Sequence, residues 1–463
     1  MKAVILAAGE GSRFRSTVAD VPKPCWRLMG AALVERAIRC AAAAGCREAV
    51  VVTGYAADRV EAFLAELTGG PGRRGRSLPI PVRWVRAPQW QRGNGASLLA
   101  AAQAVDGRRF LLLMADHVMD PRLCRQAVAA GRHLTDGQVL LLVDPRLDEV
   151  YDRDEATKVR REGARITAIG KEIACYDAVD TGVFVGGPAF FDALRAVDQG
   201  NGRLTISDAA ALLARQGRLV AHPVRDGWWV DVDDAPALAY AQSQLLQSAV
   251  SSGGDGPVAR HLNRPISRWI TALLAPTGIT ANTVTWMAFG LAVAGAAAFA
   301  AGQPVLGGLL VQLSSILDGS DGELARLRLQ AGPAGSLLDT VLDRYADAAV
   351  IAGLMVGALG QGNPLALTVG AALAALAGVP LSALIKDRVQ WLRAQRGDTA
   401  RYDPLRHDPA WLSWLPANRD GRCLVIFLAG LIGKPLWALV VLAVVANLAA
   451  FVRVRHGMAD LAR

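Results

Sequence analysis

Residues 318–326 read Asp-Gly-Ser-Asp-Gly-Glu-Leu-Ala-Arg and residues 335–343 read Gly-Ser-Leu-Leu-Asp-Thr-Val-Leu-Asp, both within long apolar segments. The aspartates are three apart in the first stretch and four apart in the second, so each pair shares one face of a helix. A carboxylate in hydrocarbon costs about 2.5–3.5 kcal/mol, so several together must be neutralised. Two such faces opposed form a cup that suits hard divalent cations, Mg²⁺ or Mn²⁺. The four carboxylates are those of Asp318, Asp321, Asp339 and Asp343.

An alternative interpretation of these charges needs no bound cation. The aspartates could line a water-filled pore, or they could pair with Arg326 and Arg344. The residues between the aspartates are mostly small or apolar and offer few such partners. The sequence therefore favours the metal site.

The composition of the chain changes from one half to the other. Among 463 residues, hydrophobic types make up 52% and charged types 20%, which excludes a disordered or fibrous protein. Residues 1–245 carry charges at ordinary spacing, whereas residues 282–455 hold long apolar runs between short loops. The sequence predicts a multidomain protein, in which an all-α membrane domain follows a soluble domain.

The second half holds six apolar segments, most of which reach the roughly 20 residues needed to cross a bilayer, whereas the segment 422–432 is short. Arginines gather in alternate loops, and by the positive-inside rule this places both ends in the cytoplasm. The apolar tetrapeptide after Lys2 is too short for a signal peptide, so we expect the first domain to face the cytoplasm as well. This pattern predicts a multi-pass protein of the cell membrane with cytoplasmic active sites. The six expected transmembrane helices lie at 282–301, 304–326, 335–359, 364–385, 422–432 and 435–452.

The charge and the cysteines narrow the choice of partners. The net charge is +9, but no basic run is interleaved with aromatic residues, so we do not expect nucleic acid as a partner. The six cysteines show neither close pairs nor metal-ligand spacing, which indicates reduced thiols.

The fixed residues from Asp318 to Asp343 resemble the signature of the CDP-alcohol phosphotransferases, which are membrane enzymes of six helices. The resemblance implies that Asp318, Asp321 and Asp339 hold two divalent ions against the pyrophosphate of the donor. Asp343 would share a metal ion and take the proton from the attacking hydroxyl. The other signature residues would lie against the nucleotide or its phosphates, and they are Gly322, Ala325, Arg326 and Gly335.

An acceptor that carries its own phosphate would need basic side chains at the cytoplasmic mouth. Basic loops are expected there in any case, because of the positive-inside rule. The nearest candidates are Lys386, Arg388, Arg419 and Arg422.

The first half begins with an apolar strand, Ala3–Leu6, that runs into a glycine-rich turn. Such a turn places backbone N–H groups around phosphates, here those of Ala8, Gly9 and Gly11. Strand and helix patterns alternate after it, which predicts a doubly wound, Rossmann-like α/β sheet.

The strand, the glycine turn with Arg13, and Pro22-Lys23-Pro24 resemble the nucleotidyltransferases that join a sugar phosphate to a nucleoside triphosphate. The resemblance implies that Arg13 and Lys23 hold the triphosphate and the attacking phosphate. Asp116 and Asp231 would coordinate Mg²⁺, with Asp233 as the alternative to Asp231. The base-reading loop would contain Gly93, Asn94 and Ser97, and the substrate side of the pocket Lys171 and Asp180.

Some neighbours of these residues have a structural interpretation instead. We expect His117 to be a polar residue at a strand end, without a part in the chemistry. Trp90 and the pair Trp228-Trp229 fit the core as well as they fit a ligand-stacking role.

The halves are joined by a segment rich in serine and glycine, which is typical of a flexible linker. The stretch after it combines arginines with a leucine, isoleucine and tryptophan face, which predicts an amphipathic helix on the cytoplasmic leaflet. The expected ranges are 1–246 for the nucleotidyltransferase domain, 247–259 for the linker, 260–280 for the amphipathic helix and 281–463 for the membrane domain.

A domain that makes an activated nucleotide thus precedes one that consumes a CDP-linked donor. Over essentially the whole chain this combination resembles the bifunctional inositol-1-phosphate cytidylyltransferase/di-myo-inositol-phosphate-phosphate synthases. The likeness implies that CTP and L-myo-inositol 1-phosphate give CDP-inositol, and that its phosphoinositol group then moves to a second inositol 1-phosphate with release of CMP. It also implies a homodimer among membrane lipids.

Two other interpretations stay open. In the first, the membrane half uses CDP-diacylglycerol to make a phosphoinositide-type lipid, and the soluble half is a sugar-phosphate nucleotidyltransferase of another pathway. In the second, the chain is a nucleotide-sensing membrane scaffold without catalysis.

Overall fold

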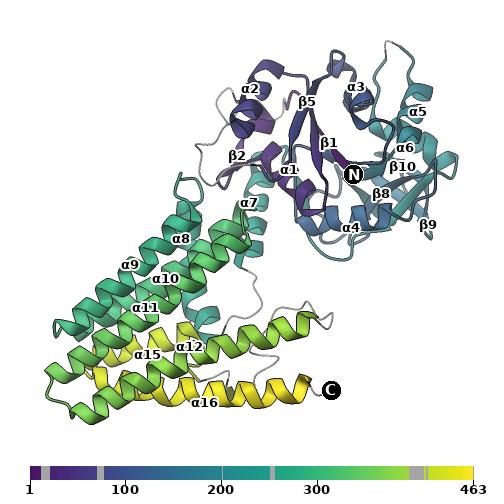
Figure 1. Ribbon diagram of the computed structural model, residues 1–463. Coiled ribbons are helices and arrows are strands. Elements are labelled where there is room, and N and C mark those ends of the chain that lie inside the picture. Colours follow the sequence, from purple (N-terminus) through teal and green to yellow (C-terminus); the bar gives the residue numbers. More distant parts are fainter. Residues whose placement is uncertain are drawn as a thin grey trace. The chain divides into compact units, whose positions relative to one another are not determined.

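The computed structural model describes residues 1–11, 21–69, 78–200, 202–250, 256–395, 411–412 and 415–461 (Figure 1). The chain divides into two compact units, Met1–Leu245 and Leu246–Arg463. Arg13 lies outside the described residues.

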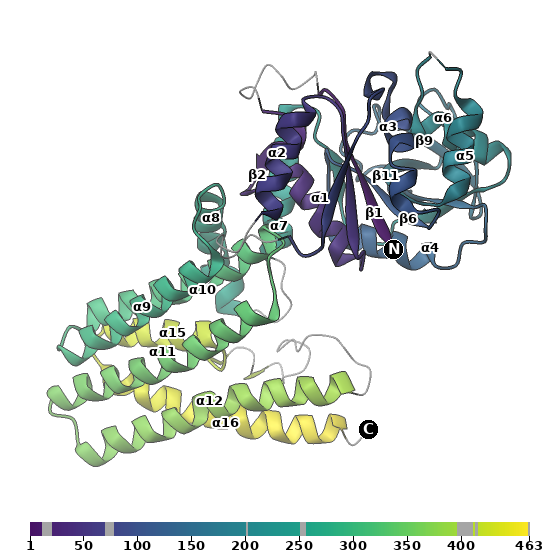
Figure 2. The same ribbon diagram turned by 45° about the horizontal axis from the view of Figure 1, so that its top comes forward.

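A nine-stranded mixed sheet forms the centre of the first unit (Figure 2). Its core strands are apolar at nearly every position because helices cover both faces of the sheet. The first four strands in the order run parallel, whereas β11 lies antiparallel to both of its neighbours β6 and β8. The order is β5 (Val82–Arg86), β4 (Glu48–Thr53), β1 (Lys2–Ala7), β6 (Phe110–Met114), β11 (Ala178–Gly186), β8 (Val139–Asp144), β12 (Leu219–Pro223), β10 (Arg165–Gly170) and β9 (Lys158–Glu162).

Helices cover the sheet in two layers. On one face α1 (Leu33–Ala43) packs against α4 (Pro121–Gly131). On the other, α3 (Asn94–Ala100), α5 (Pro188–Val197) and α6 (Ile206–Arg215) pack together over the main apolar core. α2 (Ala57–Thr68) lies beside β4 and β5. The doubly wound α/β arrangement that the alternating pattern predicts is present, with antiparallel strands added to it.

Two short two-stranded ribbons complete this unit. In one of them β7 (His117–Met119) pairs antiparallel with β13 (Trp229–Asp231). In the other, β2 (Arg27–Leu28) pairs with β3 (Ala31–Ala32) after a 3₁₀ turn at Lys23–Cys25. The first ribbon matters most, because it joins two segments more than a hundred residues apart beside the carboxyl end of β6.

The second unit is helical, and each of the six apolar segments that the sequence predicts is a helix. The helices are α9 (Ala281–Ala300), α10 (Pro304–Leu327), α11 (Pro333–Gly360), α12 (Leu365–Gln395), α15 (Arg419–Leu431) and α16 (Pro435–Leu461). Proline occupies the first turn of α10 and α11, where its missing N–H costs no hydrogen bond. α10 packs against α9 and α15, and α12 packs against α16.

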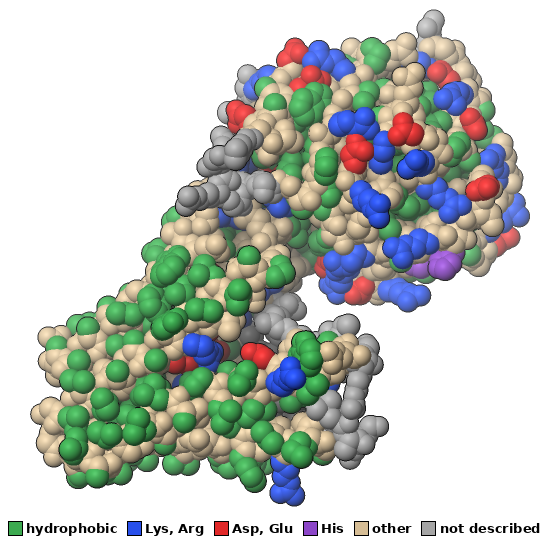
Figure 3. Space-filling view, viewed as in Figure 1, with side chains coloured by type: hydrophobic (Ala, Val, Ile, Leu, Met, Phe, Trp, Pro, Cys, Tyr) green, Lys and Arg blue, Asp and Glu red, His purple; other side chains and the backbone are tan. Residues whose placement is uncertain are grey.

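The face of the helical unit drawn in Figure 3 carries many hydrophobic side chains and few charged ones. Large hydrophobic side chains stay exposed along it, among them Leu365, Trp437 and Phe451, each about two-thirds accessible. Among the described residues, three helices are long and apolar enough to cross a membrane, namely α9, α12 and α16. α10 and α11 contain the signature carboxylates, and α15 has 13 residues.

Residues 247–250 and 257–259 of the expected linker are helical, and residues 251–255 lie outside the described residues. α7 (Ala235–Val250) extends into the range 247–259, and Leu245 and Ala249 on this helix are buried. A π-helical turn, Ala259–Asn263, then leads into α8 (Arg264–Leu274) within the range expected for the amphipathic helix.

Gly353 of α11 makes the closest approach between α9 and α11. A methyl group on Gly353 would collide with the backbone of Ala296, whereas one on Gly370 of α12 would meet open space. We expect Gly353→Ala to lower the melting temperature of the detergent-purified protein, because overpacking costs about 1–3 kcal/mol. Gly370→Ala is the matched control and should leave the melting temperature unchanged or raise it slightly. Equal melting temperatures for the two variants would contradict this packing.

Candidate active sites

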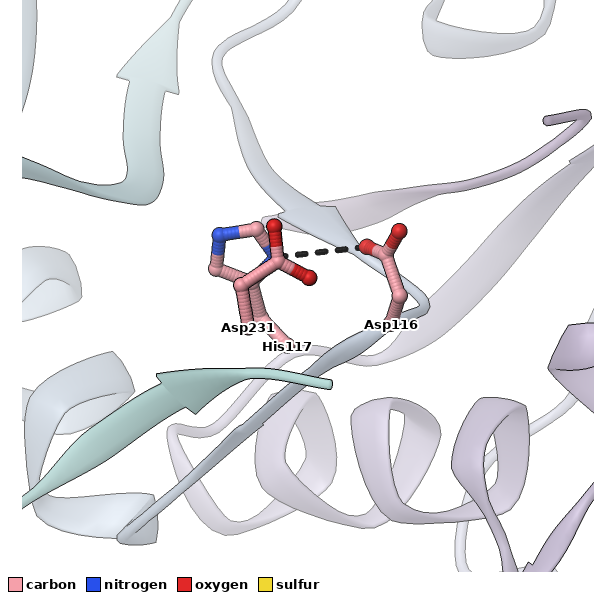
Figure 4. Close-up of side chains that lie close together, drawn as sticks. All are labelled: Asp116, His117 and Asp231. Atoms are coloured by element: carbon pink, nitrogen blue, oxygen red, sulfur yellow. Dashed lines mark hydrogen bonds and ion pairs between the residues drawn. The ribbon is translucent and has the colours of Figure 1, made fainter. Parts of the chain in front are cut away.

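The first candidate site lies at the carboxyl end of β6, where Asp116 follows the strand. The ribbon of β7 and β13 sets Asp231 directly opposite His117, and the Val232 N–H donates to the Asp116 carbonyl at 3.2 Å. Metal-binding atoms of Asp116, His117 and Asp231 all lie within 4.8 Å of one another (Figure 4). Backbone pairing thus brings together groups that are far apart in sequence.

Lys23 brings a positive charge to this cluster. Its side chain is buried, and its Nζ lies 3.1 Å from Asp116 Oδ2 and 3.9 Å from Asp231 Oδ1. It also pairs with Asp233. Burial alone would lower the pKa of Lys23, but the three carboxylates outweigh it and raise that pKa. Gly11 has a φ of +61° and lies next to the Lys23 side chain, since a Cβ on Gly11 would be 3.1 Å from Lys23 Cβ. The glycine turn and Lys23 therefore pack against each other.

His117 is held from three sides. Its Nδ1 lies 3.2 Å from Asp116 Oδ1, and its ring stacks on Trp229 with centroids 6.1 Å apart. Gly182, whose φ is +75°, faces the ring so closely that a Cβ there would sit 2.8 Å from Nε2. Burial disfavours the charged imidazole, but the neighbouring carboxylates, with Asp231 first among them, raise the pKa of His117 to about 9.

The chemistry of this cluster fits a divalent cation. Burial, and then the charge of Asp116, raises the pKa of Asp231 to about 6. Burial also raises the pKa of Asp180 to about 6. The Oδ1 atom of Asp231 is buried and accepts no hydrogen bond from any described residue. Crowded carboxylates with a free inward oxygen can hold a hard cation such as Mg²⁺.

A cavity of about 360 Å³ opens beside the cluster. Asn94, Lys171 and Asp180 line it together with Asp231. The Asn94 side chain accepts a hydrogen bond from the Ile206 N–H at 2.9 Å, which ties the start of α3 to α6. A bulge in β11 between Asp180 and Phe184 interrupts the ladder at the rim of the cavity.

Other predicted residues of the first unit are not among the described residues that line this cavity. Ala8, Gly9 and Gly11 follow β1. Ser97 is buried, and its hydroxyl donates a hydrogen bond to the Gly93 carbonyl at 3.3 Å.

The second candidate site lies between α10 and α11. Carboxylate oxygens of Asp318, Asp321 and Asp339 lie within 4.8 Å of one another, so these three residues face each other as their spacing predicts. Thr285 of α9 donates to Asp321 Oδ2 at 2.5 Å and fixes the orientation of that side chain. An all-oxygen set of this kind fits Mg²⁺ or Mn²⁺.

Arg419 of α15 reaches into the second site. Its Nη1 lies 2.6 Å from Asp318 Oδ2 and 2.7 Å from Asp343 Oδ1. Arg419 thus links Asp343, the fourth predicted carboxylate, to Asp318. The alternative interpretation named Arg326 and Arg344 as partners, but Arg344 stays 3.9 Å from Asp343 and Arg419 makes the close pairs.

The other predicted residues of the helical unit differ in their surroundings. Arg422 pairs with Asp347 at 3.0 Å, one turn beyond Asp343. Arg326 Nε donates to the Ala249 carbonyl at 2.5 Å. Arg388 stacks on Trp391 at 4.1 Å. The small residues Gly322 and Ala325 lie on α10, Gly335 lies in the first turn of α11, and Lys386 is half-buried on α12.

Sequence reasoning missed His117 as a member of the first cluster. His117 does stand at a strand end, as the first residue of β7, but the β7–β13 ribbon also brings its ring close to Asp116 and Asp231. The signal was Gly182, since a glycine in a strand marks a close approach by another group.

Comparisons with known proteins agree with this two-part organisation. The family of MobA-like NTP transferase domains matches residues 3–306, and the CDP-alcohol phosphatidyltransferase family matches residues 278–401. A protein of Rubrobacter xylanophilus named bifunctional IPC transferase and DIPP synthase is 39% identical over 448 residues, 96% of this chain and 94% of its own. Its namesake in Thermococcus kodakarensis is 33% identical and covers 92% of this chain and 89% of its own. The solved inositol-1-phosphate CTP transferase of T. maritima is 24% identical, with a TM-score of 0.44 over 52% of this chain and 95% of its own.

The geometry predicts two separate cation sites. Asp116→Asn should remove Mn²⁺ binding at the first cluster only, because the charge that holds the cation is lost there. We expect the number of bound Mn²⁺ ions per chain, measured by electron paramagnetic resonance, to fall while the remaining sites keep their affinity. Asp136→Asn, at a fully exposed aspartate of the same unit, is the control and should change nothing. An Asp116→Asn protein with the full number of ions would exclude the first site.

Proposed function

The chain belongs to the family of bifunctional IPC transferases and DIPP synthases, and from this premise we propose that its two units catalyse consecutive reactions. The first unit joins CTP and L-myo-inositol 1-phosphate to give CDP-inositol and pyrophosphate. The second moves the phosphoinositol group of CDP-inositol onto a hydroxyl of a second inositol 1-phosphate and releases CMP. The product of one site is then the substrate of the other.

One observation carries this proposal. Each unit has its own group of metal-binding side chains within 4.8 Å of one another, and each group lies in the part of the chain that a different transferase family matches. A nucleotide-sensing scaffold would need neither group. Both reactions break a phosphoanhydride bond of a cytidine nucleotide, which is chemistry that metal-binding carboxylates serve.

In the first unit, an oxygen of the inositol phosphate attacks the α-phosphorus of CTP and pyrophosphate leaves. Lys23 and Arg13 hold the phosphates and stabilise the charge that develops on them. Asp116 and Asp231 are the cation ligands, and His117 lies where it can join them or contact a phosphate. Asn94, Lys171 and Asp180 line the cavity that would hold the base and the polyol. A divalent cation bound at either cluster of the chain would neutralise the leaving group.

In the second unit, the hydroxyl of the acceptor attacks the β-phosphorus of CDP-inositol and CMP leaves. Asp318, Asp321 and Asp339 are the cation ligands, and Asp343 accepts the proton of the attacking hydroxyl. Arg419 keeps Asp343 beside Asp318, as the two short ion pairs suggest. Gly322, Ala325 and Gly335 leave room for the nucleotide, and Arg326 is within reach of its phosphates.

We also propose the membrane arrangement that these roles require. The helices α9, α10, α11, α12, α15 and α16 cross the cell membrane, both ends of the chain lie in the cytoplasm, and both sites open there. The apolar surface of the helical unit supports this arrangement. A homodimer among membrane lipids, with the domain ranges given above, completes the proposal.

The division of labour can be tested by single substitutions. Asp339→Ala and Asp343→Ala should lower CMP release at least about 100-fold, because each removes several kcal/mol of transition-state stabilisation. Pyrophosphate release from CTP should stay at the wild-type rate in both variants. Asp116→Ala should show the reverse pattern, with CMP release restored by added CDP-inositol. A well-folded variant in which one substitution stops both half-reactions would refute separate sites.

The nature of the product separates this function from the lipid-forming alternative. We expect membranes incubated with labelled inositol 1-phosphate and CTP to form a water-soluble labelled product, whose mass equals that of two inositols joined through phosphate with one further phosphate. Extraction with chloroform and mass analysis of both phases make the measurement. Label that moves into the chloroform phase only when CDP-diacylglycerol is present would favour the alternative instead.

A further inference from the structure

Glu323 is an acidic residue of the signature stretch to which the proposed mechanism gives no role. Its side chain is completely buried, yet both of its oxygens accept hydrogen bonds. Oε1 accepts from Arg264 Nη1 at 2.9 Å and from Ser267 Oγ at 2.7 Å. Oε2 accepts from Thr271 Oγ1 at 2.7 Å. All three donors come from α8, at a spacing that places them on one face of that helix.

The same face of α8 also bonds the backbone and a serine of α10. Arg264 Nη1 donates to the Gly319 carbonyl at 3.1 Å, and Ser320 Oγ donates to the Ser267 carbonyl at 3.2 Å. The contact at Gly319 is tight, because a Cβ there would lie 3.1 Å from Arg264 Nη1. α8 is therefore joined to α10 by a continuous polar contact, whose centre is Glu323.

A second polar contact fixes the far end of α8. Arg328, which follows the last turn of α10, is buried and donates to four carbonyls of the turn between α8 and α9. These carbonyls belong to Leu274, Ala275, Thr277 and Ile279, at distances of 2.6–3.2 Å. α8 thus contacts α10 near both of its ends, which restrains the rotation of α10 about its own axis.

The rotation of α10 decides where the metal-binding carboxylates point. At 100° per residue, the positions that face α8 (319, 320 and 323) lie about 150° around the helix from Asp318 and Asp321. A shift by one residue would therefore turn both aspartates away from Asp339. Glycines and serines are frequent along α10, so apolar packing alone specifies this rotation weakly.

We propose that Glu323 is a positioning residue of the phosphotransferase site, acting through α8 to hold Asp318 and Asp321 toward Asp339. The inference rests on the function proposed for that site. A buried polar contact that is fully satisfied in one register and broken in the others specifies that register. Partners that orient metal ligands typically contribute 10–100-fold to metal affinity, and Glu323 does so through the helix that carries the ligands.

The test uses the full-length protein in detergent and two substitutions that keep side-chain shape. Glu323→Gln removes the charge that faces Arg264, and Thr271→Val removes one hydroxyl donor. Both should raise the Mg²⁺ concentration for half-maximal CMP release from CDP-inositol by 10–100-fold. Pyrophosphate release from CTP, in the other unit of the same molecule, should keep its Mg²⁺ dependence.

Two matched controls accompany these variants. Thr271→Ser keeps the hydroxyl and should restore the wild-type Mg²⁺ midpoint. Thr368→Val makes the same change at a buried threonine of α12, whose hydroxyl donates to the carbonyl of Pro364, the residue before that helix, and should leave the midpoint unchanged. A merely structural role would lower the amount of active protein and hence the maximal rate, with the midpoint unmoved, and that result would overturn the proposal.

A second readout does not depend on turnover. In an Asp116→Ala background, which removes the first site, Mn²⁺ binding to the second site can be followed by electron paramagnetic resonance. Glu323→Gln should weaken this binding by the same 10–100-fold, and unchanged binding would overturn the proposal. Wild-type protein that binds Mn²⁺ at the second site but releases no CMP would refute the proposed function, and the Mn²⁺ affinities of the variants would still decide the role of Glu323.

Discussion

Carboxylates gathered between apolar helices must be neutralised, and the rest of the helical unit depends on how this is done. Asp318, Asp321 and Asp339 converge within 4.8 Å, which no arrangement of unscreened charges tolerates in a medium of low dielectric constant. Arg419 supplies one positive charge at 2.6 Å from Asp318, and Thr285 donates to Asp321. A bound divalent cation would supply the rest. The cost of burying these charges is thus the reason that α9, α10, α11 and α15 must meet at one point.

Both units bring carboxylates close together beside one basic side chain, but different secondary structures position these groups. In the first, strand pairing brings Asp231 to Asp116, and the buried ammonium of Lys23 lies against both. In the second, helix periodicity sets the spacing and a guanidinium from a later helix lies against the carboxylates. In both, one basic side chain shares the carboxylates with the expected cation. Each basic side chain would also lie close to the phosphates that such a cation binds, where positive charge favours the reaction.

Sequence patterns predicted features that depend on neighbouring residues, such as helix faces and strands. They could not predict contacts between segments that are far apart in the sequence. The three- and four-residue spacing of the aspartates was enough to predict a common face, and the apolar strand with its glycine turn predicted β1. The pairing of Arg419 with Asp318 joins residues about a hundred positions apart, so the sequence could offer Arg419 only as one of several basic candidates. The place of His117 beside Asp116 and Asp231 could not be predicted for the same reason, because it depends on the β7–β13 ribbon. Glu323 likewise acquires a role only when α8 is placed beside α10.

The helices that hydropathy identifies as membrane spans are those without the signature carboxylates. Within the described residues, α9, α12 and α16 meet the criterion, whereas α10 and α11 carry the aspartates and α15 carries Arg419 and Arg422. Each of these charged side chains lowers the mean hydropathy of its own helix. In α8, too, the apolar side chains of Trp269 and Leu273 are exposed, whereas Ser267 and Thr271 donate to Glu323 of α10. In this unit, polar contacts therefore contribute to the interior, and large apolar side chains remain on the surface.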